Sequence, residues 1–162
     1  MEILMKTHRY NIRTTWTGNS GHGTRDYRSY DRSHVIKIEG KADIEGSSDP
    51  SFRGDRSKHT PEDLFVSTLS TCHMLWYLHL CAVNGVIVLE YNDNAMGVMQ
   101  EQADGSGKFT NVTLRPEVLV AEHHMIDKAN ELHRDAHRMC FIANSVTFEV
   151  MHEPIAVSAQ KV

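Results

Sequence analysis

Three cysteines are the residues best suited to chemistry in this chain, because a thiolate is both a nucleophile and a metal ligand. Cys72 and Cys81 are nine residues apart in an apolar stretch, and Cys140 lies near the carboxyl end. If that stretch is helical, Cys81 faces the opposite side from Cys72, about 13 Å along the axis. These two thiols therefore cannot pair within one helix, whereas Cys140 can approach Cys72 if its own segment packs there.

If Cys72 and Cys140 lie close together, they could undergo a dithiol–disulfide cycle. One thiol would then attack the substrate, and the other would form a disulfide with it. The opposing interpretation is that all three cysteines are buried, unreactive small hydrophobes, and spacing alone favours it. The odd count does not indicate a structural disulfide framework.

A metal site is a further interpretation. His133 and His137 stand at i and i+4 of a predicted helix, and Cys140 follows three residues later. With Cys72 and His73 these side chains have the chemistry of zinc ligands. Histidines at this spacing are also common on solvated helix faces, and this segment carries the charged residues of such a face: Glu131, Arg134, Asp135 and Arg138.

A reactive thiol has to ionise near neutral pH, which requires a neighbouring cation. Arginine suits this role because its fork can hold a thiolate and a carboxylate at once. The loop after the first predicted strand supplies three candidates, Arg25, Arg28 and Arg32, and the candidate carboxylate is Glu62.

The segment from Thr60 to Gly85 predicts the long helix that carries Cys72. Thr60 can cap the first free N–H groups, Pro61 suits the first helical position, and Asn84 with Gly85 indicates the end. The side chains between them are too apolar for a surface helix, so we expect a mostly buried one: Leu64, Phe65, Val66, Leu69, Leu75, Trp76, Leu78 and Leu80.

The rest of the chain alternates between strand patterns and one further helix. A second helix is predicted over residues 122–139, and Pro116 indicates an edge or a bulge. The polar loop 46–59 is long enough to suggest a functional role. Strands are predicted at residues 10–17, 34–39, 86–91, 95–100, 109–120, 145–150 and 155–157. This order predicts an α+β fold with antiparallel sheets, in a single domain over residues 1–162.

Composition narrows the class of protein. The 162 residues are 40% hydrophobic and 23% charged, which is typical of a soluble globular domain. A formal charge of −4 without a basic block argues against nucleic acid as a partner. No apolar run is long enough for a membrane span, and the first ten residues carry no secretory signal. We therefore expect a protein of the reducing cytoplasm.

A motif in the central segment resembles a known family. Residues 60–65 (TPEDLF) followed by residues 69–72 (LSTC) resemble the Asn-Pro-Glu-x-Leu…Ser-x-Cys signature of the OsmC/Ohr family, the osmotically inducible protein C and organic hydroperoxide resistance proteins. The ten-residue gap from Glu62 to Cys72 matches it. Residues 16–18 (WTG) and 23–25 (GTR) agree with other parts of the family pattern, and the loop and carboxyl-terminal segments resemble an OsmC-like subgroup.

The resemblance implies a thiol-dependent peroxidase that reduces organic hydroperoxides. Cys72 would be the attacking thiol and Cys140 the resolving thiol, with Arg25 and Glu62 holding the thiolate ready. The implied fold is an intertwined homodimer with two long helices packed against antiparallel sheets. The implied electron donor is a dithiol of the lipoyl type, with no metal and no bound cofactor. Phe141 stands where well-known branches of the family have proline after the second cysteine.

Further assignments complete the expected site. His73 is a candidate auxiliary to Cys72, and Cys81 is expected to be structural. An apolar substrate pocket is expected from Phe65, Leu69 and Trp76, with plain core packing as the alternative.

Helix geometry adds a constraint on this site. Ten helical residues separate Glu62 from Cys72 by about 15 Å, so both can serve one site only if Glu62 comes from a second copy. Shared active sites in a homodimer are therefore expected. The alternatives are a catalytically silent OsmC-like stress or binding protein, and a metal-dependent enzyme using His133, His137 and Cys140.

Overall fold

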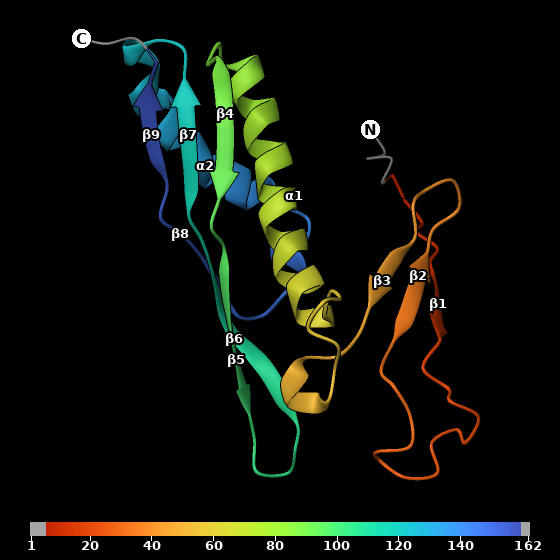
Figure 1. The fold of residues 1–162 in the computed structure, drawn as a ribbon. Coiled ribbons are helices and arrows are strands. Elements are labelled where there is room, and N and C mark those ends of the chain that lie inside the picture. Colours follow the sequence, from red (N-terminus) through yellow and green to blue (C-terminus); the bar gives the residue numbers. More distant parts are fainter. Residues whose placement is uncertain (1–5, 160–162) are drawn as a thin grey trace. The chain divides into compact units, whose positions relative to one another are not determined.

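The computed structural model describes residues 6–159, and Figure 1 shows the ribbon. Its elements, in chain order, are β1 (Arg13–Trp16), β2 (His34–Lys37), β3 (Ile44–Gly46), η1 (Pro50–Phe52), α1 (Pro61–Val83), β4 (Val88–Asp93), β5 (Met96–Glu101), β6 (Gly107–Leu114), β7 (Pro116–Val120), η2 (His123–Met125), α2 (Ile126–Met139), η3 (Ala143–Ser145), β8 (Glu149–His152) and β9 (Ile155–Ser158). They form two units with a boundary between Leu64 and Phe65, in the first turn of α1. The prediction of a single domain over residues 1–162 stays a prediction, and its ends, residues 1–5 and 160–162, lie outside the described residues.

The amino-terminal unit, described over residues 6–64, is built on the antiparallel sheet β1–β2–β3. Sequence patterns predicted its first two strands and missed β3, because three residues ending in Gly46 show no alternation. A glycine suits this position, since a Cβ would collide with the His34 ring on the paired strand. Among residues 6–64 no apolar side chain is fully buried; the buried residues are Gly18, Gly46, Ser47 and Thr60.

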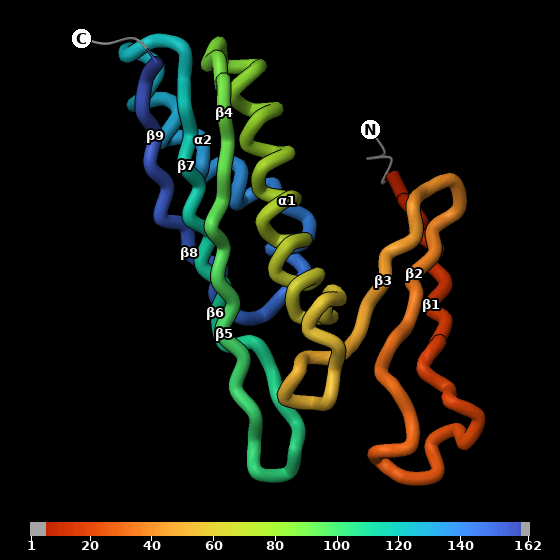
Figure 2. Tube along the Cα trace, viewed as in Figure 1, coloured from red at the N-terminus to blue at the C-terminus, as the bar shows by residue number. Residues whose placement is uncertain are grey.

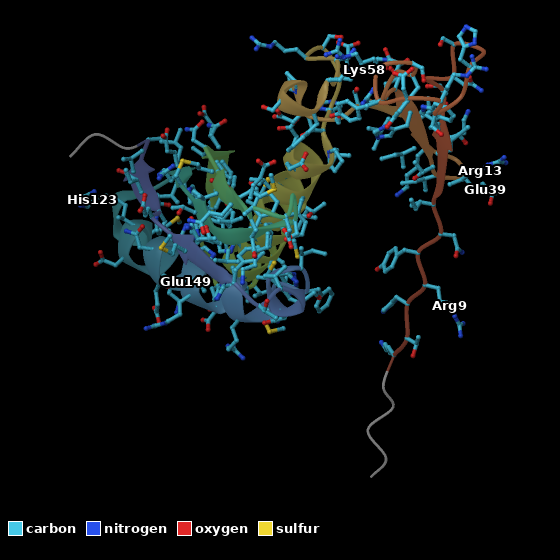
Figure 3. All side chains as sticks on the ribbon, turned by 90° about the horizontal axis from the view of Figure 1, so that it is seen from below. Arg9, Arg13, Glu39, Lys58, His123 and Glu149 are labelled. Atoms are coloured by element: carbon cyan, nitrogen blue, oxygen red, sulfur yellow. The ribbon has the colours of Figure 1, made fainter. Side chains whose placement is uncertain are left out.

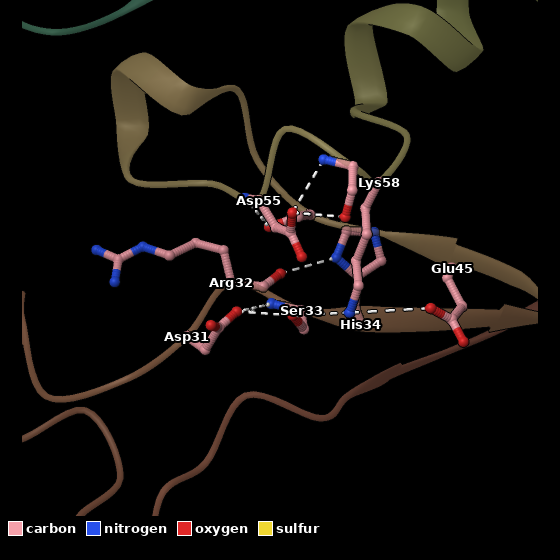
Figure 4. A network of polar contacts seen from close by, with 9 residues as sticks. Asp31, Arg32, Ser33, His34, Glu45, Asp55 and Lys58 are labelled. Carbon is pink, nitrogen blue, oxygen red and sulfur yellow. Dashed lines mark hydrogen bonds and ion pairs between the residues drawn. The ribbon is translucent and has the colours of Figure 1, made fainter.

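Polar contacts order the loops of this unit in place of a core (Figure 4). The Asp31 carboxylate accepts hydrogen bonds from the backbone N–H and the hydroxyl of Ser33, at 2.8 and 2.7 Å. The Lys58 ammonium in turn donates to the Ser33 hydroxyl at 3.1 Å. Asp55 holds Ser57 in the same way as Asp31 holds Ser33. Side-chain to backbone bonds of this kind fix turns locally, without burial of apolar surface.

Both predicted ends of α1 are confirmed. The Thr60 hydroxyl accepts the Asp63 N–H at 3.1 Å, and the Asp63 carboxylate accepts the Thr60 N–H at 3.0 Å, which is a reciprocal capping arrangement. At the other end Gly85 adopts a left-handed φ of 72°, and the Val86 N–H donates to the Cys81 carbonyl at 2.9 Å. These bonds satisfy backbone groups that a helix end otherwise leaves unpaired.

The expectation that α1 is mostly buried is wrong for this chain by itself. One stripe of side chains, four residues apart, is fully buried: Leu69, His73, Tyr77 and Cys81. Leu75 and Val83, on other faces, are 63% and 65% exposed. The helix is apolar nearly all round, but the chain provides packing for only one stripe, which leaves apolar surface uncovered.

The carboxy-terminal unit, described over residues 65–159, contains the sheets β4–β7–β9 and β5–β6–β8. Figure 2 shows β4 running on into β5 along one continuous trace. The predicted strand 109–120 is split at Arg115, and Pro116 begins β7, where a missing N–H is tolerated. The α+β class with two helices is confirmed, but the sheets are mixed, because β6–β8 and β7–β9 are parallel. The crossover through α2 returns the chain in the same direction.

Two hydrophobic clusters fill this unit. One joins α1 and α2 to the sheet β4–β7–β9 around Tyr77, Val118 and Leu132, and the other joins α1 to β6 and β8 around Leu69 and Leu114. Polar side chains such as those of His123 and Glu149 point outward (Figure 3). In residues 6–159 no helix has the length and apolar character required to cross a membrane.

Candidate active site

The Cys72 and Cys140 thiols meet in the carboxy-terminal unit. Cys72 is half-buried on α1, and Cys140 is the first residue after α2, with 1% of its surface exposed. The Cys140 thiol lies beside the Cys72 thiol, and neither is in a disulfide. The structure therefore brings together two thiols whose approach the spacing in the sequence leaves open.

The surroundings of Cys140 keep its thiol protonated. Burial, followed by the hydrogen bond with Cys72, raises the pKa of the Cys140 thiol to about 11. The Ala143 N–H also donates to the Cys140 sulfur at 3.4 Å, which opposes this rise in pKa only in part. At neutral pH the Cys140 thiol is therefore protonated.

Cys81 lies in a different environment. It is 1% exposed in the cluster that includes Tyr77 and Val86, and burial raises the pKa of its thiol. A buried, protonated thiol is a poor nucleophile. This position agrees with a structural role for Cys81.

Glu62 stands at the start of α1, ten residues before Cys72. The helix is continuous between them, so about 15 Å of rise separates the two residues along one copy of α1. Its Oε2 is buried and has no hydrogen-bond partner among the described residues. An unpaired buried carboxylate oxygen is costly, so Glu62 has capacity for a further donor.

The glycine-rich loop that precedes the candidate arginines is held by Asn19. Its side-chain oxygen accepts the N–H groups of Gly21 and Gly23, at 2.9 and 3.0 Å. Both glycines have φ values in the left-handed region, 102° and 57°. The loop is thus ordered by its own hydrogen bonds, in the way that Asn side chains order turns.

Of the three candidate arginines, Arg32 is committed to its own loop. Its guanidinium donates to the carbonyls of Tyr30 and Tyr27 at 2.6 and 2.8 Å and lies over both rings, 4.1 and 4.4 Å from their centroids. The Arg25 and Arg28 side chains are exposed, and neither has a hydrogen-bond or ion-pair partner within residues 6–159. Arg25 and Arg28 therefore remain available to a thiolate.

The three residues expected to line an apolar pocket divide between core and surface. Leu69 is 1% exposed in the core, and Phe65 packs against Phe109 and Phe148, with ring centroids 4.9 and 6.0 Å apart. For these two the plain core interpretation agrees with the structure. Trp76 alone remains next to open surface.

Trp76 meets Phe141 edge to face, with ring centroids 5.6 Å apart. Trp76 lies one helical turn after Cys72, and Phe141 directly follows Cys140, so the pair adjoins both thiols along the chain. An open hollow of about 290 Å³ lies beside it, lined by Leu75, Trp76 and His79. In the sequence Phe141 is only a departure from a family pattern, because its contact with Trp76 depends on tertiary packing.

His73 is part of an interior cluster. It is 1% exposed, and its Nε2 lies 3.0 Å from Nδ1 of His133. His152 of β8 joins them, with its ring centroid 4.5 Å from that of His73. No pattern in the sequence indicates this cluster, because His73, His133 and His152 lie far apart along the chain and His152 falls between two predicted strands.

The alternative metal site finds no geometric support. Within residues 6–159 no group of three or more His, Cys, Asp or Glu side chains is arranged to hold a metal ion. His133 faces His73, while Cys140 faces Cys72.

Comparisons with known proteins agree with this architecture. A family model described as OsmC-like protein matches residues 54–153. A solved OsmC-like protein of unknown function from Vibrio cholerae is 32% identical, with a TM-score of 0.83, and the match covers 92% of this chain and 100% of that one.

More distant solved structures share the fold. An organic hydroperoxide resistance protein from Elizabethkingia anophelis is 20% identical, with a TM-score of 0.67 over 95% of this chain and 99% of that one. The organic hydroperoxide resistance protein OhrB of Bacillus subtilis is 18% identical, with a TM-score of 0.62 over 90% and 98%. No curated protein matches the chain significantly.

Proposed function

The chain belongs to the OsmC-like family, and on this premise we propose that it is a thiol-dependent peroxidase that reduces organic hydroperoxides. Cys72 is the attacking thiol and Cys140 the resolving thiol. The observation that carries the proposal is the proximity of these two thiols, one half-buried and one buried. Relatives of the same fold that are described as organic hydroperoxide resistance proteins support the substrate class.

The proposed cycle needs only thiols and the peroxide. The Cys72 thiolate attacks the distal peroxide oxygen, so that an S–O bond forms, the O–O bond breaks and, after protonation, an alcohol leaves. The Cys140 sulfur then attacks the Cys72 sulfenic acid, the disulfide forms and water leaves. A dithiol of the lipoyl type reduces this disulfide to two thiols and becomes a disulfide itself. The two electrons that reduce the peroxide therefore come from the dithiol.

The difference between the two thiols supports this division of roles. The raised pKa of Cys140, about 11, keeps it protonated while Cys72 reacts. Only the thiolate is a strong nucleophile, so Cys140 does not compete for the peroxide. Its proton can leave with the hydroxide that departs from the sulfenic acid, as water.

We assign the activation of Cys72 to Arg25 and Glu62, as the family resemblance implies. The buried Oε2 of Glu62 has no hydrogen-bond donor, and the Arg25 side chain has no partner within residues 6–159. Both observations support an ion pair between a Glu62 carboxylate and the Arg25 guanidinium. The 15 Å or so of helix between Glu62 and Cys72 then calls for Glu62 of a second copy. We therefore propose a homodimer with two shared sites. Apolar surface left open on α1, at Leu75 and Val83, supports such a partner.

The aromatic pair Trp76 and Phe141 supports organic hydroperoxides over hydrogen peroxide. An apolar hollow favours a substrate with an alkyl or aryl group, because burying that group contributes about 25 cal/mol per Å². A reducing cytoplasm, which supplies dithiol donors, is the compartment that we propose.

Thiol counting with peptide mass mapping, before and after one equivalent of cumene hydroperoxide, tests the proposal. We expect two thiols to disappear and one peptide cross-linked through Cys72 and Cys140 to form. The Cys72→Ser variant should lose hydroperoxide turnover, and Cys140→Ser should stop at a Cys72 sulfenic acid. Cys81→Ser is the matched control and should retain turnover, since Cys81 is buried in the core.

The other outcomes are equally informative. If Cys72 stops at sulfenic acid in the unaltered protein, the role of Cys140 as resolving thiol is wrong. If no thiol reacts and no turnover occurs with a dithiol donor, the protein is a binding or stress-related member of the family.

A further inference from the structure

Four histidine side chains gather inside the carboxy-terminal unit, from three different elements. They are His73 of α1, His133 and His137 of α2, and His152 of β8. The His73 and His133 rings are stacked, 7° from parallel, with their nitrogens 3.0 Å apart. The His152 ring lies 4.5 Å from both the His73 and the His137 rings. The cluster therefore links the two helices to a strand.

The hydrogen bonding of His73, His133 and His152 suits neutral imidazole. His73 Nδ1, His133 Nε2, His137 Nδ1 and His152 Nε2 are buried and have no hydrogen-bond partner within residues 6–159. In the one contact between nitrogens, one ring donates and the other accepts, which a neutral pair satisfies. An imidazolium carries an N–H on both nitrogens, so protonation of either ring would remove the acceptor or add an unpaired buried donor.

The electrostatic surroundings also favour neutral rings. Burial is the largest cause that lowers the pKa of His73 to about 3 and those of His133 and His152 to about 4. Every charge effect that lowers these pKa values further comes from another histidine of the cluster. A second proton in the cluster is therefore opposed by the first.

The titratable groups packed around the cluster are neutral as well. Tyr77 of α1 stacks against the His73 and His133 rings, and both Cys81 of α1 and Tyr91 of β4 lie against Tyr77. Burial raises the pKa of each of these three groups, so none supplies a negative charge. Asp93, at the end of β4, acts on Tyr91 and accepts hydrogen bonds from Ser70 and Arg115.

We propose that His73, His133 and His152 form an acid-sensitive lock between α1, α2 and β8, which their neutral rings hold closed and their protonation opens, exposing the Cys140 thiol. The link to Cys140 is direct, because its backbone N–H donates to the carbonyl of His137 at 3.2 Å. Release of the end of α2 therefore releases Cys140. This lock does not rest on the proposed peroxidase activity.

Labelling of Cys140 with 4,4′-dithiodipyridine in the reduced Cys72→Ser variant, where Cys140 has no mixed disulfide beside it to attack, followed by peptide mapping, measures the opening. In the open state the histidines would have their ordinary pKa of about 6.5. Below that pH, each such histidine increases the population of the open state by up to about tenfold for every pH unit. We expect labelling of Cys140 to accelerate at least about tenfold between pH 6.5 and pH 5, although its thiolate becomes rarer. His133→Gln and His152→Gln, which cannot titrate, should each weaken this acceleration, while the exposed control His123→Gln should retain it.

Labelling of Cys140 that slows steadily with falling pH, as the thiolate alone dictates, would overturn the lock. If the glutamine variants do not fold, NMR titration of the imidazole rings in the unaltered protein tests whether the buried histidines stay neutral until the structure opens. We expect three rings to stay neutral down to about pH 4, followed by cooperative loss of structure. Ordinary titration of all the histidines near pH 6.5, with the fold intact, would contradict the proposal.

Discussion

The two units of this protein are stabilised in different ways. The carboxy-terminal unit has two hydrophobic clusters, and side chains such as Tyr77 and Val112 have no exposed surface. In residues 6–64 no apolar side chain is fully buried, and Ile12 is 60% exposed. The amino-terminal unit depends instead on strand pairing and on polar turns such as Asp31 with Ser33.

This difference indicates which unit needs another surface packed against it to be stable. A three-stranded sheet requires an apolar face packed against something to be stable in water. The carboxy-terminal unit provides its own core, whereas the sheet β1–β2–β3 does not bury one. A second copy, as proposed for the shared sites, would supply that cover.

The largest expected difference between the two units is in how their stability responds to acid. The pKa values of His73, His133 and His152, about 3 to 4, lie below the unfolded value of 6.5, so the unfolded state binds more protons between these limits. The free energy of unfolding of the carboxy-terminal unit should therefore fall by several kcal/mol as the pH drops from 6.5 towards 4. The pKa of Asp31 is lowered from 3.8 by its bonds with Ser33, so this turn loses its contribution only at still lower pH.

Each unit contains one tryptophan, Trp16 or Trp76, so tryptophan fluorescence can follow the unfolding of each unit separately. Urea unfolding of Trp16→Phe reports on the carboxy-terminal unit through Trp76, and Trp76→Phe reports on the amino-terminal unit through Trp16. We expect the Trp76 signal to lose stability between pH 6.5 and pH 4 before the Trp16 signal does. Equal losses in both would mean that the units unfold together.

Truncation of apolar side chains should have the next largest effect. Leu114→Ala removes a side chain that is 1% exposed, and should lower the free energy of unfolding by about 3 kcal/mol, because a cavity is left. The matched change Ile12→Ala should cost less than about 0.5 kcal/mol in dilute protein, where its side chain stays exposed. Denaturant unfolding of both variants checks this.

Protein concentration sharpens the same comparison. If a second copy covers the amino-terminal unit, the cost of Ile12→Ala and the protection of β1–β3 amides from hydrogen exchange should rise with concentration. The amides of β6 and β7 should not change. A cost of Ile12→Ala that is large at all concentrations would show that this sheet has a core of its own.

The cap of α1 should contribute a smaller amount. Thr60→Ala removes the acceptor of the Asp63 N–H, and should lower the free energy of unfolding by about 1 kcal/mol. Thr60→Ser keeps the hydroxyl and should recover most of this loss. If thermal unfolding shows no difference between the alanine and serine variants, the cap does not stabilise the helix.

The smallest expected effect concerns an ion pair on the surface of the amino-terminal unit. Lys37 and Asp43 are 2.8 Å apart, but both side chains are about half exposed. Lys37→Ala should therefore change the free energy of unfolding by no more than about 0.5 kcal/mol, and less in high salt. A loss above about 1 kcal/mol would mean that this pair lies in a covered interface.

The amino-acid sequence by itself determined features that depend on neighbours along the chain. The ends of α1 follow from Thr60 and from Asn84 with Gly85, whose caps are local. The apolar face of α2 and the α+β class follow from periodicity, and the motif around Cys72 indicated the family.

Only the tertiary structure decided which distant residues meet. The contact of Cys72 with Cys140, the pair Trp76 and Phe141, and the position of His152 beside His73 all depend on how α2 and β8 return to α1. The parallel pairing of β6 with β8 has the same origin. Such contacts are set by packing across the whole unit, and no pattern of neighbouring residues encodes them, because each element is compatible with several partners until the core is filled.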